Sequence, residues 1–273
     1  MAKSRSEATR SRREELERAR LAQAAKERKL RIGMVSGGLV VIVAVLIIVI
    51  VTINQKSAGG VVTPTHGDAD QTGIVFPKAD ALQAGAPTLE IFTDFQCPIC
   101  KDYETGLGDT IQQIMNDGSA KVVFRTMTFL DGNLSSQNSA AGTSKSSNRA
   151  AIAAACADTI PGDLYYPFVR AIFDNQPATE GDGYSDAVLR DTVPGTVGIQ
   201  GADLTTFQQC YDKRQTGSFV QKVHDNATAA GIKATPTFRL NGTDITKDLK
   251  SDDPKTLTDA IAAVTEASAA AGS

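Results

Sequence analysis

The chain has 273 residues, which is enough for one domain of ordinary size and additional segments. Its formal net charge of −3 is the sum of a basic and an acidic part. Residues 1–31 hold 11 Lys/Arg and 5 Asp/Glu (+6), and the remaining residues hold 17 Lys/Arg and 26 Asp/Glu (−9). A basic end alone would suit nucleic acid, but the segment that follows explains it better, so we expect no nucleic-acid partner.

Residues 32–53 form an uncharged run rich in Val, Ile and Leu that is long enough to cross a bilayer as a helix. The basic arm, residues 1–31, should stay in the cytoplasm and the rest of the chain outside it. We therefore predict a single-pass protein of the cell membrane. A cleaved signal peptide is the alternative, but its apolar core is usually shorter, and no good cleavage site follows this run.

The basic arm has two interpretations, contact with anionic lipid head groups or a topology signal alone. Residues 54–72 are rich in Gly, Pro, Ser, Thr and Asp, which predicts an extracytoplasmic linker in which His66 has no specific role. Residues 73–273 are predicted to form the folded domain, starting with a short strand at 73–76.

The stretch that carries the chemistry is T-L-E-I-F-T-D-F-Q-C-P-I-C at residues 88–100. Its apolar residues predict a buried strand over 86–95 that leads directly into a helix. Pro98 suits the first helical position, which places Cys97 and Cys100 on one helical face with their sulfur atoms in reach of each other. The helix N-terminus favours a thiolate at Cys97 and makes a disulfide there easy to reduce, so such a site would oxidise other proteins.

A C-x-x-C pair also forms half of some zinc sites, which need a second pair of ligands at set spacing. Cys156 and Cys210, like the two histidines His66 and His224, are single and far apart, so we expect no metal. A purely structural disulfide across so short a loop would add little stability. Redox chemistry without a cofactor is the favoured interpretation, and cysteines confined to the outer part fit an oxidising compartment.

The rest of the chain predicts an α/β domain with a helical insertion. The helix after the cysteines should end at Gly118, and a strand at 121–127 then completes a βαβ unit with a parallel strand pair. Helical patterns fill about residues 131–231, with helices expected at 148–157, 164–175, 203–213 and 219–230. Strands at 237–240 and 243–245 flank an Asn-Gly hairpin turn, and a last helix opens at Asp253-Pro254.

Two motifs together resemble a known family. D-F-Q-C-P-I-C at residues 94–100 and A-T-P-T at residues 234–237 resemble the DsbA-type thiol–disulfide oxidoreductases of the thioredoxin superfamily, in particular the membrane-anchored actinobacterial members. The resemblance covers about residues 73–266. It implies a thioredoxin-like fold with a helical insertion, here preceded by the N-terminal transmembrane helix.

By this resemblance, Cys97 matches the family's nucleophile and Cys100 its resolving cysteine, with active-site neighbours at Asp94, Pro98 and Ile99. The resemblance also assigns two substrate-binding residues, Thr235 and Pro236.

Pro236 matches the family's cis-proline, which faces the disulfide, and Thr235 precedes it. Peptide groups around Thr235 would then pair with an extended substrate segment as an added strand. Taken alone, Thr235-Pro236 would better fit an ordinary trans turn before a strand, and the cis interpretation is favoured only together with the C-P-I-C motif.

The chain departs from the family pattern at two positions. Many related enzymes carry a buried acid six residues before the nucleophile, where this chain has Ile91, and strand alternation points the adjacent Glu90 to the opposite face. Asp94 and water are the remaining candidates for the proton acceptor of Cys100. Ile99 stands where the best-known DsbA motif has His, which implies milder oxidising power.

Cys156 and Cys210 fall in predicted helices of the insertion. Some actinobacterial relatives carry a second disulfide in their helical domain, so the resemblance implies a structural bridge between these two residues. Two inert buried thiols are the alternative.

Three functions follow from these features: an enzyme that donates disulfides to unfolded or reduced secreted proteins, a reductase or isomerase of the same fold, and a non-catalytic binding module. The intact C-x-x-C and Pro236 argue against the third. An isomerase would usually need a dimerisation domain, and none is recognised, so we expect a monomer. By the resemblance, the reoxidant would be a quinone-linked membrane protein of the DsbB or vitamin K epoxide reductase type.

Overall fold

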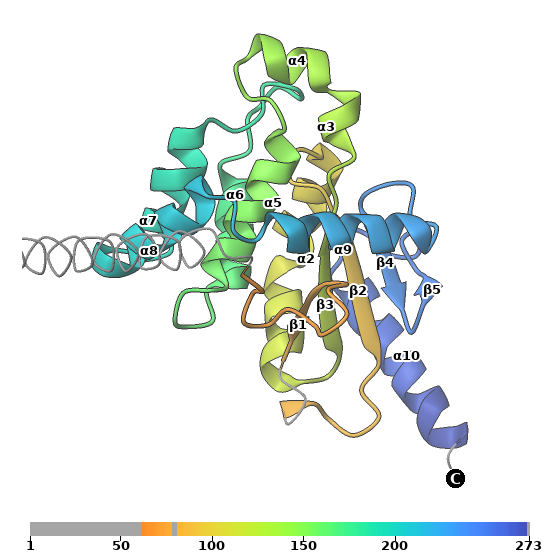
Figure 1. Cartoon of the computed structure of the whole chain (residues 1–273). Coiled ribbons are helices and arrows are strands. Elements are labelled where there is room, and N and C mark those ends of the chain that lie inside the picture. The colour runs from red at the N-terminus through yellow and green to blue at the C-terminus, as the bar shows by residue number, and fades with distance from the viewer. Residues whose placement is uncertain (1–61, 78–80, 272–273) are drawn as a thin grey trace, which may run out of the picture. The chain divides into compact units, whose positions relative to one another are not determined.

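A central sheet organises the computed structural model, which describes residues 62–77 and 81–271 (Figure 1). Its strands lie in the order β1-β3-β2-β4-β5. β2 and β3 pair in parallel, as the predicted βαβ unit requires, and the other neighbours pair antiparallel. The strand bounds are β1 Ile74–Phe76, β2 Thr88–Thr93, β3 Lys121–Thr126, β4 Thr237–Leu240 and β5 Thr243–Asp244.

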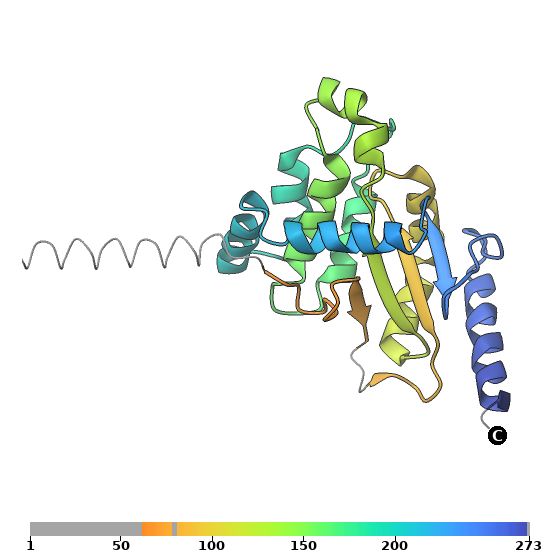
Figure 2. The same ribbon diagram turned by 45° about the vertical axis from the view of Figure 1, so that its right-hand side comes forward.

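The two faces of the sheet are covered by different helices. Leu89 and Ile91 of β2 belong to the main hydrophobic core, together with the buried residues of α2 (Pro98–Asp117). Phe92 points the other way and packs near Ala227 of α9 (Gly217–Ala229), which crosses the front of the sheet in Figures 1 and 2. This alternation decides which side chains of β2 can reach the cysteines at the start of α2.

Helix α2 begins and ends as the sequence predicts. Pro98 occupies its first turn, where a missing N–H costs nothing. At the C-terminal end Gly118 adopts a left-handed conformation (φ 68°), and its N–H donates to the Ile114 carbonyl. A side chain at Gly118 would also collide with the carbonyl of Ala81, so glycine is required there on two grounds.

The helical insertion lies between β3 and β4. Its centre is α5, which is buried on all sides because its Ala-rich sequence lets neighbouring helices approach closely. The four predicted helices of the insertion are confirmed to within two residues at each end, and shorter helical segments were not predicted. The bounds are α3 Leu130–Asn133, α4 Ser135–Ala140, α5 Ser146–Ala157, α6 Tyr165–Asp174, the π-helical turn η2 Val188–Thr192, α7 Val193–Thr196 and α8 Gly201–Asp212, followed by α9.

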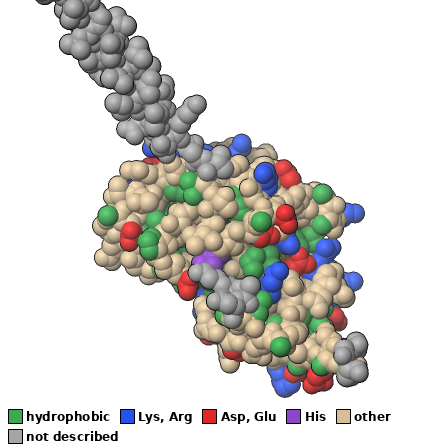
Figure 3. Space-filling model, turned by 60° about the horizontal axis from the view of Figure 1, so that its bottom comes forward, with side chains coloured by type: hydrophobic (Ala, Val, Ile, Leu, Met, Phe, Trp, Pro, Cys, Tyr) green, Lys and Arg blue, Asp and Glu red, His purple; other side chains and the backbone are tan. Residues whose placement is uncertain are grey.

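The C-terminal helix α10 (Lys255–Ala271) completes the domain and adds Leu257 and Ile261 to the main core. On the face in Figure 3, basic and acidic side chains are interspersed and apolar side chains form small separate groups. Among the described residues of that face, the Lys and Arg side chains form no continuous stripe.

The N-terminal predictions meet the structure only in part. The basic arm at 1–31 and the transmembrane helix predicted at 32–53 lie outside the described residues. No helix within 62–77 and 81–271 is both long and apolar enough to cross a membrane.

The predicted linker at 54–72 needs a correction, because residues 62–72 are attached to the domain. The Thr65 N–H donates to the carbonyl of Asp158 at the end of α5. His66 Nδ1 lies 2.7 Å from Asp158 Oδ1, and its ring packs 4.3 Å from that of Phe76. The prediction that His66 has no specific role was therefore wrong: the buried Asp158 carboxylate needs hydrogen-bond donors, and His66 supplies two of them.

Candidate active site

The turn between β2 and α2 places Cys97 at the start of a helix. β2 ends at Thr93, and the Cys97 N–H donates to the Asp94 carbonyl at 2.9 Å. Cys97 is the N-cap of α2, and its Sγ accepts the Cys100 N–H at 3.3 Å. The sulfur atom thus replaces the oxygen of an ordinary capping side chain at the positive end of the helix dipole.

The pKa of the Cys97 thiol is lowered to about 7, mainly by a hydrogen bond from the Cys100 thiol. The Cys100 backbone N–H and the Thr235 side chain lower it further, while burial and the Asp94 charge act in the opposite direction. A thiol with this pKa is substantially a thiolate at neutral pH, which is the reactive form in disulfide exchange.

Cys100 has the opposite properties. It lies one turn deeper, only 3% exposed, and burial followed by the neighbouring Cys97 sulfur raises its pKa well above the usual value. The Asp94 backbone N–H and the Thr93 side chain oppose this rise. Both cysteines are free thiols in the structure. The pair therefore consists of one thiol that ionises readily and one that holds its proton.

The chain brings a distant proline loop against this pair. The Thr235–Pro236 peptide bond is cis rather than trans. The Thr235 carbonyl oxygen lies 3.5 Å from Cys97 Sγ, and Pro236 lines a small cavity together with Cys100. Residues that are 138 positions apart in the sequence thus form one site.

Comparison with known proteins agrees with this geometry. A family model described as "Thioredoxin" matches residues 82–261, well over half of the chain. The chain belongs to this thioredoxin family.

One curated relative and two solved structures give a more specific comparison. Disulfide bond formation protein D of Bacillus subtilis (strain 168) is 28% identical over 155 residues, which are 56% of this chain and 63% of that protein, so the match spans less than two thirds of this curated relative. The crystal structure of oxidised BdbD from Bacillus subtilis has a TM-score of 0.56 and 24% identity, covering 76% of this chain and 98% of that one. MdbA from Actinomyces oris, described as a thiol-disulfide oxidoreductase, has a TM-score of 0.58 and 16% identity over the same shares. These likenesses confirm the predicted thioredoxin-like fold with its helical insertion.

In this thioredoxin-like site, the two residues between the cysteines face solvent. Pro98 is exposed, and Ile99 is 57% exposed, which makes it the large hydrophobic side chain with the most exposure among the described residues. An apolar side chain is thus exposed to solvent two residues after Cys97.

Asp94 is fully buried, and burial raises the pKa of its carboxyl to about 6. The carboxylate accepts hydrogen bonds from Ser147 Oγ at 2.6 Å, the Gln96 N–H at 3.0 Å and the Leu130 N–H at 3.1 Å. Its oxygens thus face the insertion, so the structure gives Asp94 a role in holding the active-site turn.

Two residues of the insertion that sequence reasoning missed also fix this turn. Gln176 Nε2 donates to the carbonyls of Phe95 at 2.8 Å and Cys97 at 3.1 Å. The buried Tyr184 hydroxyl donates to the Phe95 carbonyl as well, at 2.8 Å. These contacts join positions about 80 to 90 residues apart, and a single sequence carries no periodic or motif signal for them.

The acid positions near Cys100 follow the predicted strand alternation. Ile91 faces the α2 side of the sheet, and Glu90 points to the other face, where its Oε1 pairs with Arg125 at 2.7 Å. A second acid that the sequence analysis missed, Glu104, is mostly buried one turn after Cys100. The i, i+4 spacing from Cys100 was the available signal for it.

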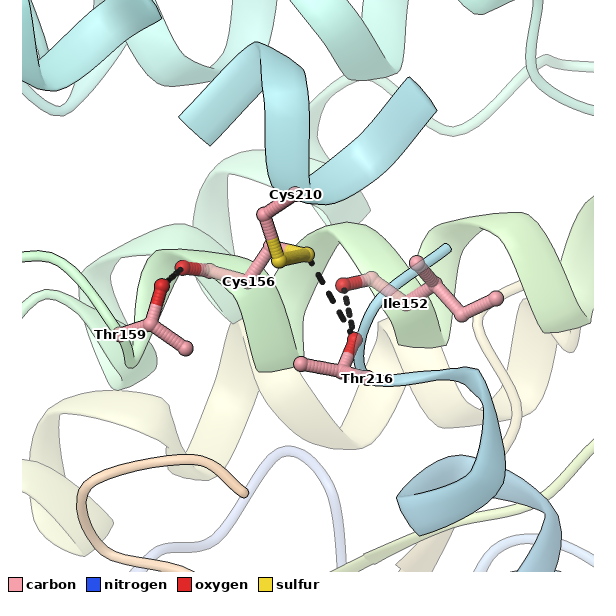
Figure 4. Close-up of a disulfide and its surroundings, with 5 residues drawn as sticks. All are labelled: Ile152, Cys156, Thr159, Cys210 and Thr216. Atoms are coloured by element: carbon pink, nitrogen blue, oxygen red, sulfur yellow. Dashed lines mark hydrogen bonds between the residues drawn. A yellow bond between two sulfur atoms is a disulfide. The ribbon is translucent and has the colours of Figure 1, made fainter. Parts of the chain in front are cut away.

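Outside the redox pair, Cys156 of α5 and Cys210 of α8 form a disulfide with a Cα–Cα distance of 5.8 Å (Figure 4). Both residues are buried, and the Thr216 hydroxyl lies 3.5 Å from Cys156 Sγ while donating to the Ile152 carbonyl. The alternative of two free thiols was therefore wrong. Within the described residues, no group of three or more His, Cys, Asp or Glu could hold a metal ion.

Proposed function

We propose that this protein is a thiol–disulfide oxidoreductase that donates disulfide bonds to unfolded or reduced secreted proteins. The observation that carries the proposal is the difference between the two thiols, because the pKa of Cys97 is lowered to about 7 and that of Cys100 is raised. A disulfide between them stores two oxidising equivalents. Both cysteines are buried, but Cys97 is 6% exposed and Cys100 3%, so the readily ionised Cys97 is the sulfur that a substrate would attack.

The reaction follows from this geometry. A substrate thiolate attacks Cys97 Sγ of the Cys97–Cys100 disulfide, the bond between the two cysteines breaks, and Cys100 leaves with the electron pair. A second substrate thiolate then attacks the substrate sulfur of the mixed disulfide, and Cys97 leaves as a thiolate. The substrate has lost two electrons and gained a disulfide, and the enzyme is a dithiol.

The loop before β4 offers the substrate a binding edge. The Thr235 backbone lies beside Cys97 Sγ and would pair with an extended substrate segment as an added strand. Ile99 would contact apolar side chains that an unfolded protein exposes. Main-chain pairing with apolar contact recognises many sequences, as an enzyme for unfolded substrates requires.

A reductase of the same fold is the second candidate, and one observation favours it. A pKa of about 7 at Cys97 is nearer to that of the thioredoxin cysteine (about 7) than to that of DsbA (about 3.5). The name of the Bacillus subtilis relative, which refers to disulfide bond formation, supports the donor.

The proposed location is the outer side of the cell membrane, with residues 32–53 as a single anchor and the basic arm in the cytoplasm. The charge difference across this run and the disulfide in the insertion support it. A DsbB-type or vitamin K epoxide reductase-type membrane protein would return the electrons to quinone. Membrane-impermeant thiol reagents should label reduced Cys97 on intact cells, whereas labelling only after lysis would contradict this topology.

The test of the function is a trapping experiment with matched variants. The oxidised full-length protein should restore disulfides to a reduced, unfolded test protein. When the test protein is offered with its disulfides intact, the Cys97 thiolate of Cys100→Ala should attack one of them and accumulate substrate linked covalently through Cys97, because Cys100 is absent and can no longer displace the substrate. Cys97→Ala should trap little. Absence of oxidation by the intact protein, or equal trapping by both variants, would contradict the proposed roles.

A further inference from the structure

The glutamine that directly precedes Cys97 is buried, although the exchange reaction does not use its side chain. Gln96 is only 4% exposed. A buried amide is costly unless its donors and its acceptor find hydrogen-bond partners. A buried amide one residue before the nucleophile therefore indicates a specific role, which depends on the partners that it binds.

Three helices of the insertion converge on this one side chain. Gln96 Nε2 donates to Ser147 Oγ of α5 at 2.8 Å and to Asp131 Oδ1 of α3 at 3.3 Å. Gln96 Oε1 accepts a hydrogen bond from Asn138 Nδ2 of α4 at 2.8 Å. The side chain thus connects the backbone before Cys97 to α3, α4 and α5 at once.

The partners of Gln96 are themselves fixed in the insertion, so they cannot follow the active-site turn if it moves. The Asp131 carboxylate accepts two backbone N–H groups from the first turn of α5, at 2.8 and 2.9 Å. Asn138 is fully buried, and its Nδ2 also donates to the Gly181 carbonyl at 2.8 Å. Gln96 is therefore held by groups whose own positions do not depend on the cysteines.

This contact matters most when the pair is reduced, and both cysteines are free thiols in the structure. A Cys97–Cys100 disulfide would join the two side chains covalently and restrict the turn by itself. In the dithiol, non-covalent contacts position Cys97, and its Sγ accepts the Cys100 N–H at 3.3 Å. A shift of the turn would weaken this stabilisation of the Cys97 thiolate, whereas the closed disulfide carries no charge that the helix N-terminus could stabilise.

We propose that Gln96 is a positioning residue that makes the Cys97–Cys100 pair more oxidising, because it stabilises the reduced form more than the disulfide form. A pair whose dithiol is stabilised takes up electrons more readily and is the stronger oxidant. This inference rests on the proposed disulfide exchange, and it assigns part of the oxidising power to the insertion.

The experiment measures the equilibrium of the full-length protein with glutathione. Two glutathione thiols reduce the Cys97–Cys100 disulfide and form oxidised glutathione, so two electrons and two protons enter the pair. Gln96→Ala should shift this equilibrium toward the disulfide by about three- to tenfold, which makes the potential about 15 to 30 mV more negative. Alkylation followed by peptide mass spectrometry reads Cys97 separately from the Cys156–Cys210 disulfide.

A purely structural role of Gln96 would give a different result, because its contacts would then stabilise both redox forms equally. Gln96→Ala would lower the melting temperature of both forms alike and leave the glutathione equilibrium unchanged, which would overturn the inference. The inference instead predicts that the reduced form loses more melting temperature than the oxidised form.

The matched control is Gln112→Ala, which removes an amide of α2 that donates to the Asn116 side chain at 3.0 Å on the surface. Its glutathione equilibrium should stay within about 1.5-fold of native. Asn138→Ala removes the donor to Gln96 Oε1 and should shift the equilibrium in the same direction as Gln96→Ala. The double variant should shift it by less than the sum of the two, because both residues act through one contact. Fully additive shifts would overturn the inference.

If Gln96→Ala does not fold, the native protein still provides a test. NMR of nitrogen-15-labelled protein follows the exchange of glutamine side-chain amide protons with water. In the reduced protein, the Gln96 amide should be protected by its two acceptors, and exchange as fast as that of the exposed Gln113 would overturn the inference. A native pair that does not equilibrate with glutathione at all would instead contradict the proposed function, so the two failures are distinguishable.

Discussion

At the residue scale, the chemistry of the pair follows from position in the helix. Cys97 is the N-cap, so its sulfur accepts a backbone N–H and faces the positive end of the dipole. Cys100 lies within the first turn, against the sheet, where burial opposes ionisation. Two identical side chains three residues apart thus acquire opposite acid–base behaviour.

Thr235 is predicted to tune this difference. Its side chain lowers the pKa of Cys97, so Thr235→Val should raise that pKa. Hydrogen bonds to charged groups contribute on the order of 1.5 kcal/mol, which corresponds to a loss of thiolate of up to about tenfold below neutral pH. The rate of Cys97 alkylation by iodoacetamide as a function of pH measures this pKa as the midpoint of the profile. A midpoint equal to that of the native protein would show that Thr235 acts only through its backbone.

At the element scale, long elements were predictable and short ones were not. α2, α5 and α6 have apolar periodicity or end signals such as Pro98 and Gly118 within the chain itself. α3 and α4 consist mainly of Ser, Asn, Gly and Asp and have no apolar stripe. Tertiary hydrogen bonds hold that region instead, as when Asp131 accepts the first N–H groups of α5 from Ser147 and Asn148.

The same distinction separates the predictable from the unpredictable part of the site. The two cysteines and Pro236 could be predicted because each lies in a short sequence motif, C-P-I-C or A-T-P-T. Gln176 and Tyr184 act only because the insertion folds back over the turn, and no local pattern encodes that contact. Glu104 had a helical spacing but needed the burial and the cavity to distinguish it from a surface acid.

The disulfide between α5 and α8 is predicted to stabilise the insertion without affecting the redox pair. It closes a loop of 54 residues, for which the chain-entropy estimate is at most about 4 kcal/mol. Cys156→Ala/Cys210→Ala should therefore lower the free energy of unfolding by up to about this amount. Denaturant unfolding measures it, and Cys97 alkylation in the same variant serves as the control. Unchanged stability would contradict the prediction, as would a shifted Cys97 midpoint.

At the scale of the whole molecule, buried carboxyl groups set the pH dependence of stability. Burial raises the pKa of Asp94 from 3.8 to about 6 and that of Glu104 from 4.5 to about 7. A carboxyl whose folded pKa exceeds its unfolded pKa favours the folded state most when protonated. Its contribution is fully present below the unfolded pKa and is lost as pH rises through the folded pKa.

As the pH rises from about 4 to about 7, Asp94 should lower the free energy of unfolding of the reduced domain by on the order of 3 kcal/mol, because its pKa is shifted by about two units. Asp94→Asn removes this pH dependence, so the stability of the native protein relative to the variant should fall by that amount over the same interval. Urea unfolding of both proteins at the two pH values measures it. A stability difference that is independent of pH would contradict the raised pKa.

The most direct test of the central claim is the reduction potential of the Cys97–Cys100 pair, measured at equilibrium against glutathione. Donation of disulfides to secreted proteins predicts a potential clearly less negative than the thioredoxin value of about −270 mV, toward the range of about −180 to −120 mV of known disulfide donors. A value near that of thioredoxin would contradict the donor function and support the reductase instead.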